Sequence, residues 1–245
     1  MKTAFITGAA RGLGREVAIA LGRDGHALYL ADILGDELER TAAELREAGH
    51  KVTTRVLDVR RRAECFAAVE DCVAQAGALD VLVNVAGILR MEHFTEMPEE
   101  GWNQILAVNL SGPVFLCQAA IPHLIAAKGN IVNVTSATGL FGAAYASAYA
   151  ATKAAMNSIT RTLAMEYTDQ PIRINAVCPG AMTTPMTAAP VMPENANLEV
   201  LTRYRGLRGQ MHPAELAAVV AFLASDAASA VHGALWAADG GMSAG

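Results

Sequence analysis

The chain has 245 residues, of which 53% are hydrophobic and 18% are charged. This length suffices for one large α/β domain with a substantial core, and the apolar composition suits a parallel sheet covered on both faces. The net charge of −5 and the lack of a basic patch or nucleic-acid motif in the sequence argue against nucleic acid as a partner.

The four cysteines do not have the spacing of a metal site. They form no C-x-x-C pair, and no histidines flank them at ligand spacing. Two of them lie seven residues apart on an expected helix, which fits packing better than metal binding. We therefore expect no metal and a cytoplasmic location with four reduced thiols, namely Cys65, Cys72, Cys117 and Cys178.

An expected strand over residues 2–7 leads into a glycine-rich loop and then into a helix over 15–23. The loop reads Gly8-Ala9-Ala10-Arg11-Gly12-Leu13-Gly14. Glycines let the backbone approach a phosphate without a side chain in the way, and a helix N-terminus offers free N–H groups to an anion. We predict that this loop binds a dinucleotide through Gly8, Arg11, Gly12 and Leu13.

The second expected strand, residues 27–31, ends in Asp32. An acid about twenty residues past the glycines can accept hydrogen bonds from both ribose hydroxyls of the adenosine half. The same carboxylate would repel a 2′-phosphate. Asp32 therefore favours NAD over NADP.

Further strands are expected over residues 52–57 and 79–83, separated from the second by a helix over 35–48. Asp58 follows the third strand, and from the residues alone it is also a candidate N-cap for a helix starting near Arg60. Asn109 lies inside a long helical region, where asparagine is unfavourable by propensity. The uncharged segment 101–127 is interrupted by polar residues, so we interpret it as a buried helix and expect no membrane span.

Ser136, Tyr149 and Lys153 follow an expected strand over residues 131–134. Residues four apart on a helix share a face, so the Lys153 ammonium should lie one turn from the Tyr149 phenol. A nearby cation lowers the pKa of a tyrosine from its ordinary value of about 10. Taken alone, such a pair is more often a surface contact, but with Ser136 at the carboxyl end of a strand it indicates proton transfer.

The remaining elements are a strand over 172–177, a helix from 212 to 223 and a last strand over 234–238. The order and spacing of all these motifs, across residues 7–241, resemble the short-chain dehydrogenase/reductase family. The chain has Asn84-Val85-Ala86-Gly87 where the family has Asn-Asn-Ala-Gly. The resemblance implies one doubly wound, Rossmann-like α/β domain with a seven-stranded parallel sheet.

The same resemblance implies the reversible oxidation of a small-molecule alcohol to a carbonyl with NAD(H). In the family, the tyrosine accepts the hydroxyl proton and the serine holds the substrate oxygen. The lysine stabilises the phenolate and binds the nicotinamide ribose, and an asparagine holds a water that relays the proton. These roles fall on Tyr149, Ser136, Lys153 and Asn109.

Further cofactor contacts are implied in the same way. The third-strand aspartate would bind the adenine amino group, and the residue after it would pack on the ring. A Pro-Gly turn after the sixth strand would bring residues to the nicotinamide carboxamide. Arg11 stands where NADP-using relatives often have a basic residue, but for the choice between NAD and NADP we give Asp32 more weight. The residues expected to contact NAD outside the glycine loop are Asp32, Asp58, Val59, Asn84, Ala86, Tyr149, Lys153, Met182 and Thr184.

Two larger features are also implied. Residues 187–210 are irregular, as functional or mobile segments often are, and in the family this segment is the lid over the substrate. The helices expected at 101–127 and 148–167 carry too few charges to be fully solvated, so we expect them to pair with a second subunit. The family resemblance implies that the assembly is a homotetramer.

Three alternatives remain open. The nearest is an NADP(H)-dependent 3-oxoacyl carrier-protein reductase of the same fold. The second is a non-catalytic nucleotide-binding regulator, against which the four intact catalytic residues argue. The third is a lyase or epimerase, because fold does not determine chemistry. The substrate itself is not apparent from the sequence.

Overall fold

The computed structural model describes residues 1–188, 191–204 and 206–244. Seven strands form one sheet in the order β3-β2-β1-β4-β5-β6-β7, and every neighbouring pair is parallel. The predicted seven-stranded parallel sheet is therefore confirmed. The strands are β1 (Thr3–Thr7), β2 (Ala27–Asp32), β3 (Val52–Val56), β4 (Val81–Asn84), β5 (Asn130–Val134), β6 (Arg173–Pro179) and β7 (Leu235–Ala238).

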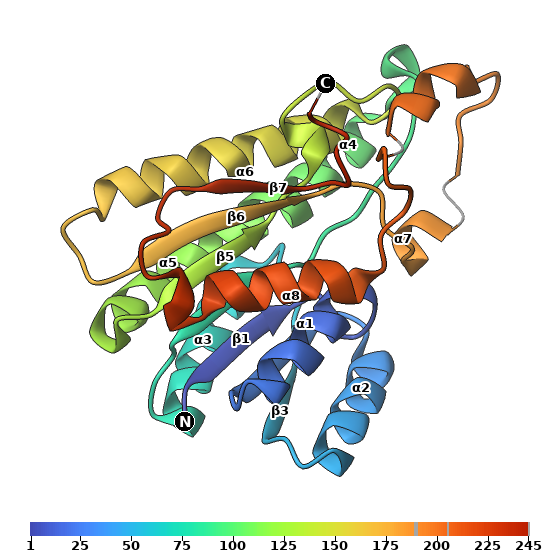
Figure 1. Cartoon of the computed structure of the whole chain (residues 1–245). Coiled ribbons are helices and arrows are strands. Elements are labelled where there is room, and N and C mark those ends of the chain that lie inside the picture. Colours follow the sequence, from blue (N-terminus) through green and yellow to red (C-terminus); the bar gives the residue numbers. More distant parts are fainter. Residues whose placement is uncertain (189–190, 205, 245) are drawn as a thin grey trace.

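Helices cover both faces of the sheet (Figure 1). One face packs against α1 (Gly12–Arg23), α2 (Gly35–Glu47) and α8 (Pro213–Ala224), and the other against α3 (Arg62–Ala76), α5 (Gly112–Ala127) and α6 (Ser147–Glu166). Alternate residues of β1 supply the two cores: Ala4 and Ile6 belong to one apolar cluster and Phe5 to the other. This alternation explains why the strands read as continuous apolar runs.

The strand order reverses at β1, which lies between β2 and β4. The chain leaves β1 toward α1 on one face and leaves β4 toward the helices on the other face. The loops at the carboxyl ends of β1 and β4 therefore diverge. Open α/β sheets bind their ligands in the crevice that such a divergence creates.

A long apolar helical stretch lies on the face of the sheet that α3 and α6 also cover. It consists of α4 (Glu99–Leu106), a π-helical segment (Ala107–Ser111) and α5. The stretch Glu99–Ala127 is long and apolar enough to cross a membrane by length and composition, and half of its most apolar window is buried inside the protein. Leu116 and Leu124 are fully buried. The π segment contains Asn109, the residue whose low helix propensity made it unusual within this helical region.

Some boundaries differ from those expected. Helix α1 begins at Gly12, because the last glycines of the loop form its first turn. Helix α3 begins only at Arg62, with Arg61 at the N-cap position and no capping side chain among the described residues. The interpretation of Asp58 as a helix N-cap is therefore wrong.

The segment predicted as a lid is only partly described. It holds the end of α7 (Pro185–Ala188) and a 3-10 segment (Leu198–Tyr204). Residues 189–190 and 205, which fall within the predicted lid, lie outside the described residues. Further 3-10 turns occur at Phe94–Glu96, Ala137–Gly139 and Asp226–Ala228.

Candidate active site

A cleft of about 590 Å³ runs along the carboxyl edge of the sheet. Thirteen of the predicted site residues line it, whereas Asn84 and Asn109, also among the described residues, lie behind its wall. A more open groove of about 840 Å³ lies between α1 and α8, and no described residue that the sequence singled out lines it. The residues in the cleft are Gly8, Arg11, Gly12, Leu13, Asp32, Asp58, Val59, Ala86, Ser136, Tyr149, Lys153, Met182 and Thr184.

The glycine loop is shaped by close backbone approaches. Gly8 and Gly12 have φ of +66° and +58°, a conformation that favours glycine. A Cβ on Gly8 would lie 2.9 Å from the Ala86 backbone, and one on Gly14 would lie 2.0 Å from the Gly8 carbonyl oxygen. The N-cap residue of α1, Arg11, makes no side-chain cap within the described part of the chain. The first turn of α1 thus offers backbone N–H groups to an anion.

Thr7, which the sequence interpretation left out of the site, joins the two diverging loops. Its hydroxyl oxygen accepts hydrogen bonds from the backbone N–H groups of Val85 and Ala86, each at 3.1 Å. The threonine is buried at the end of β1. The sequence signal for this role was a threonine directly between the apolar strand and the glycine loop, because a hydroxyl at the end of a buried strand needs a partner.

Asp32 lies at the end of β2 and faces the glycine loop. Its carboxylate accepts a hydrogen bond from the Ala10 N–H at 3.0 Å and another from the Leu34 N–H at 3.0 Å. A carboxylate has about four lone-pair sites, so two remain for a ligand. Arg11 extends from the loop toward Glu37, with the charged atoms 3.5 Å apart.

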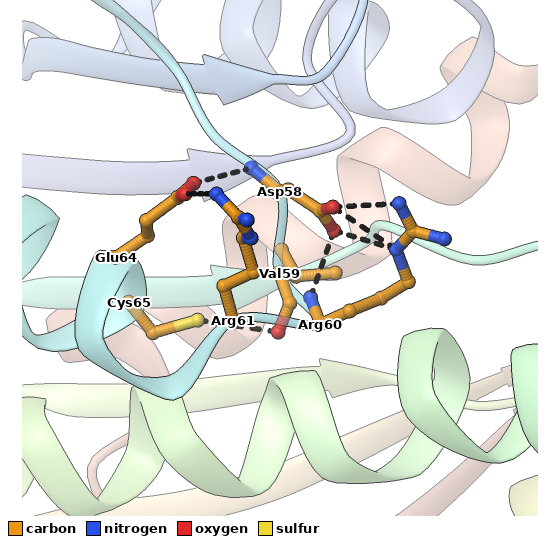
Figure 2. Close-up of polar contacts among 6 residues, drawn as sticks. All are labelled: Asp58, Val59, Arg60, Arg61, Glu64 and Cys65. Atoms are coloured by element: carbon orange, nitrogen blue, oxygen red, sulfur yellow. Dashed lines mark hydrogen bonds and ion pairs between the residues drawn. The ribbon is translucent and has the colours of Figure 1, made fainter.

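At the end of β3, Asp58 is engaged by Arg60 (Figure 2). The Arg60 guanidinium and backbone N–H donate four hydrogen bonds of 2.7–3.0 Å to the Asp58 carboxylate. These bonds, with that of the side chain the largest cause, lower the pKa of Asp58. Arg61 instead donates to Glu64 at 2.7 Å.

Ser136, Tyr149 and Lys153 meet at the opposite end of the cleft. The Lys153 Nζ lies 5.5 Å from the centre of the Tyr149 ring and donates to the Val134 carbonyl at 3.0 Å. Ser136 is buried, and its hydroxyl oxygen accepts from the backbone N–H and the hydroxyl of Thr138. The predicted shared face of Tyr149 and Lys153 is present on α6.

The expectation that Lys153 lowers the pKa of Tyr149 is wrong for this structure. Burial raises the pKa of the Tyr149 phenol, and only a hydrogen bond from Ser136 acts in the opposite direction. Burial also lowers the pKa of Lys153, to about 8. Enclosure of both groups in the cleft thus outweighs their proximity.

Asn109 and Asn84 organise the wall of the cleft. The Asn109 side chain accepts from the Ile88 N–H and donates to the Ile88 carbonyl, both at 2.8 Å. A Cβ on Gly87 would lie 3.4 Å from the Asn109 Oδ1 and 3.7 Å from the Lys153 Nζ, so both side chains border this glycine. Asn84 donates to the Asn133 Oδ1 at 2.9 Å and ties β4 to β5.

Beyond β6, Met182 and Thr184 border the cleft. Met182 pairs with Met211 in an isolated bridge. The hydroxyl groups of Thr184 and Thr187 are 3.1 Å apart, and the Thr187 hydroxyl also donates to the Met182 carbonyl. This turn is therefore held by its own side chains, next to Gly12 of the glycine loop.

Tyr145, another residue that the sequence interpretation missed, contacts the described part of the segment predicted as a lid. The Tyr145 hydroxyl accepts from the Asn197 N–H at 2.8 Å, and its ring packs edge-on against His93 at 5.3 Å. His93 in turn donates to the Glu194 carbonyl at 2.7 Å. Tyr145 has φ of +63°, which is uncommon for a side chain of this size.

These features define a Rossmann-like α/β fold with a glycine loop at one end of the cleft and the Ser136, Tyr149 and Lys153 cluster at the other. The residues present fit a nicotinamide dinucleotide. Glycines that leave no room for a Cβ border the N-terminus of α1, whose N-cap side chain makes no capping bond, and an acid with open lone-pair sites follows at the next strand.

Comparisons with known proteins lead to the same class. A family model described as enoyl-(acyl carrier protein) reductase matches residues 8–243. The 3-oxoacyl-[acyl-carrier-protein] reductase of Thermotoga maritima is 38% identical over 98% of this chain and 97% of its own length. The cis-4-hydroxycyclohexanecarboxylate dehydrogenase of Sinomonas cyclohexanicum is 36% identical over 99% of this chain and 97% of its own length.

Among solved structures, a short-chain dehydrogenase from Mycobacterium paratuberculosis bound to NAD has a TM-score of 0.90 and 27% identity, covering 98% of this chain and 97% of the other. The chain belongs to the short-chain dehydrogenase/reductase family. It is an oxidoreductase of that family, whose members bind nicotinamide dinucleotides.

Proposed function

We propose that this protein interconverts a small-molecule alcohol and the corresponding carbonyl compound with NAD(H). The observation that carries the proposal is the shared cleft. Tyr149, Ser136 and Lys153 lie at one end of the same 590 Å³ space whose other end holds the glycine loop and Asp32. A dinucleotide stretched between these ends would bring its nicotinamide to the tyrosine.

In this proposal Tyr149 moves the proton. It accepts the proton of the substrate hydroxyl during oxidation and returns it to the oxygen during reduction. Ser136 holds the substrate oxygen. Its hydrogen bond to Tyr149 keeps the phenol hydroxyl next to that oxygen. Bound NAD(H) supplies or accepts the hydride.

Lys153 and Asn109 support the tyrosine. The Lys153 ammonium would stabilise the phenolate once it forms and would bind the nicotinamide ribose. Asn109 would hold a water that carries the proton outward. Because burial raises the pKa of Tyr149, the phenol stays protonated at neutral pH, so reduction is favoured there and oxidation increases with pH.

We further propose NAD rather than NADP. Asp32 retains acceptor sites for the ribose hydroxyls, and a 2′-phosphate beside this carboxylate would be repelled. The Arg11 guanidinium lies by Glu37, which reduces its capacity to offset that repulsion. The NAD-bound relative supports the same cofactor type.

Other proposals concern the surroundings of the site. Residues 187–210 would form the substrate lid of a single catalytic domain, and the apolar helices would pair in a homotetramer. The four cysteines are free and buried, which supports a reducing, cytoplasmic compartment. Ala86, Met182 and Thr184 line the cleft and would contact the cofactor. Asn84 lies behind the wall, where its bond to Asn133 would support the loop that carries Ala86.

A second candidate is a 3-oxoacyl carrier-protein reductase that uses NADP(H), favoured by the 38% identical relative of that name. The deciding experiment uses two substrates taken from the names of the relatives. These are a 3-oxoacyl thioester and cis-4-hydroxycyclohexanecarboxylate, each offered with both cofactors, together with a panel of sugars, steroids and cyclic alcohols. Turnover with NAD or NADH at least tenfold above the phosphorylated cofactor supports the first proposal. Strict dependence on NADPH with the thioester would replace it by the second.

A further inference from the structure

An ion pair between Arg60 and Asp58 lies at the end of β3. Its position affects how the cleft can bind a nucleobase. This inference rests on the proposed function, because it assumes that the dinucleotide lies along the carboxyl edge of the sheet. The glycine loop follows β1, Asp32 follows β2, and Asp58 follows β3, which is the next strand outward. A nucleotide whose phosphates lie at β1 and whose ribose lies at β2 extends its base toward β3.

The wall of the cleft at this position suits a purine ring. Leu57 and Val59 are buried and line the cleft together with the more exposed Ile33. Asp58 lies between Leu57 and Val59 and offers acceptor oxygens. The exocyclic 6-amino group of adenine is a donor, so the Asp58 carboxylate is its natural partner here.

In the structure, however, both oxygens of that carboxylate are engaged by Arg60. One oxygen accepts from the Arg60 backbone N–H at 3.0 Å and from the Arg60 Nε at 2.9 Å. The other accepts from the same Nε at 3.0 Å and from the Nη2 at 2.7 Å. Three N–H groups thus converge on the carboxylate, with the single Nε hydrogen shared between its two oxygens, and they occupy most of its roughly four lone-pair sites. An adenine amino group that binds Asp58 therefore competes with the guanidinium for these oxygens.

We propose that Arg60 competes with the 6-amino group of adenine for the Asp58 carboxylate, and so weakens the binding of adenine dinucleotides. Displacement is feasible because the pair is exposed to solvent: the side chains of Arg60 and Asp58 are 43% and 19% exposed. Exposed ion pairs are weak, so the guanidinium can swing outward into water. The competition therefore reduces affinity by a few-fold and does not abolish binding.

The neighbouring residue provides a matched control. Arg61 is 70% exposed, and its guanidinium pairs with Glu64 and makes no hydrogen bond to the Asp58 carboxylate (Figure 2). Arg60→Ala and Arg61→Ala each remove one positive charge from the same turn. Any general electrostatic effect on the anionic dinucleotide is therefore similar in the two variants, and the difference between them isolates the competition.

The test is a double-mutant cycle in which NAD affinity is measured by isothermal titration calorimetry. Arg60→Ala should bind NAD about threefold more tightly than the unaltered protein, on the scale of an exposed ion pair, and Arg61→Ala should not bind more tightly. Asp58→Ala should bind more weakly. In the Asp58→Ala background, adding Arg60→Ala should bring no gain, because nothing remains to compete for.

Other results would overturn the inference. Weaker NAD binding by Arg60→Ala in both backgrounds would mean that Arg60 contacts the cofactor directly. An unchanged affinity in Asp58→Ala would mean that the base lies elsewhere. Both results leave the proposed function intact, since the unaltered protein still binds NAD. If the unaltered protein does not bind NAD at all, the proposed function and this inference fail together.

Discussion

Lys153 carries a stability cost that follows from its position. Only 5% of the residue is exposed, and its ammonium donates to the Val134 carbonyl at 3.0 Å. Burial, the largest cause, lowers its pKa from 10.5 to about 8. Replacing this lysine by methionine, which has a similar length and no charge, should therefore stabilise the folded protein near neutral pH.

The magnitude and its pH dependence follow from proton linkage. Between the folded pKa of about 8 and the unfolded value of 10.5, the unfolded chain binds more protons, so the free energy of unfolding increases with pH. Burial of the charge costs about 3 kcal/mol at pH 7, and the cost falls to about 1 kcal/mol at pH 9.5. Loss of the bond to Val134 costs about 1 kcal/mol at every pH. Lys153→Met should thus gain about 2 kcal/mol at pH 7 and almost nothing at pH 9.5.

The assay is urea unfolding followed by tryptophan fluorescence, at one protein concentration and at several pH values from 6.5 to about 9.5, which start below the folded pKa of about 8 and extend into the range over which the linkage acts. Lys51→Met is the control, because Lys51 is exposed and its ammonium stays solvated in both states. The control should follow the unaltered protein across this range. A Lys153→Met variant that is less stable at pH 7, or whose stability runs parallel to that of the unaltered protein, would refute the reasoning.

Three further predictions follow. Asp32→Ala combined with Ile33→Arg should shift the ratio of turnover with NAD to turnover with NADP by about tenfold toward NADP. Equal turnover with both cofactors in the unaltered protein would contradict the proposal that Asp32 selects NAD. Tyr145→Phe removes the hydroxyl that accepts from the Asn197 N–H, so KM for substrate should rise about threefold while NAD affinity is kept. A loss of NAD affinity instead would show that this contact supports cofactor binding. The chain should form a tetramer, because helix α6 exposes the apolar Met165, at 79%, and the long helix Glu99–Ala127 is only half buried in its most apolar part; a monomer mass by light scattering at micromolar concentration would contradict this.

The sheet and helix α6 were predictable because their signals are local. Strands buried on both faces read as apolar runs, as residues 27–31 do, and each run ends where the sheet offers its ligand edge. The spacing of Tyr149 and Lys153 determines a shared face on any helix. For the same reason the glycine loop was predictable, since positive φ and close backbone approach require glycine.

Features that depend on tertiary enclosure were not predictable. The pKa of Tyr149 rises because the cleft closes around it, and spacing along a helix contains no information on burial. Arg60 reaches Asp58 only because α3 starts late and leaves a free turn before it. The left-handed conformation of Tyr145 is likewise determined by the contacts of its ring and hydroxyl with distant segments.

In the proposed mechanism Tyr149 transfers a proton to or from a substrate at the end of the cleft that would hold the nicotinamide. This step is tested most directly by comparing the unaltered protein with Tyr149→Phe on a substrate from the panel, measuring NADH formation by its absorbance and NAD affinity by calorimetry. The phenylalanine keeps the ring, so NAD affinity should survive, while turnover should fall by a factor on the order of 10² or more. Near-normal turnover by Tyr149→Phe would contradict the account.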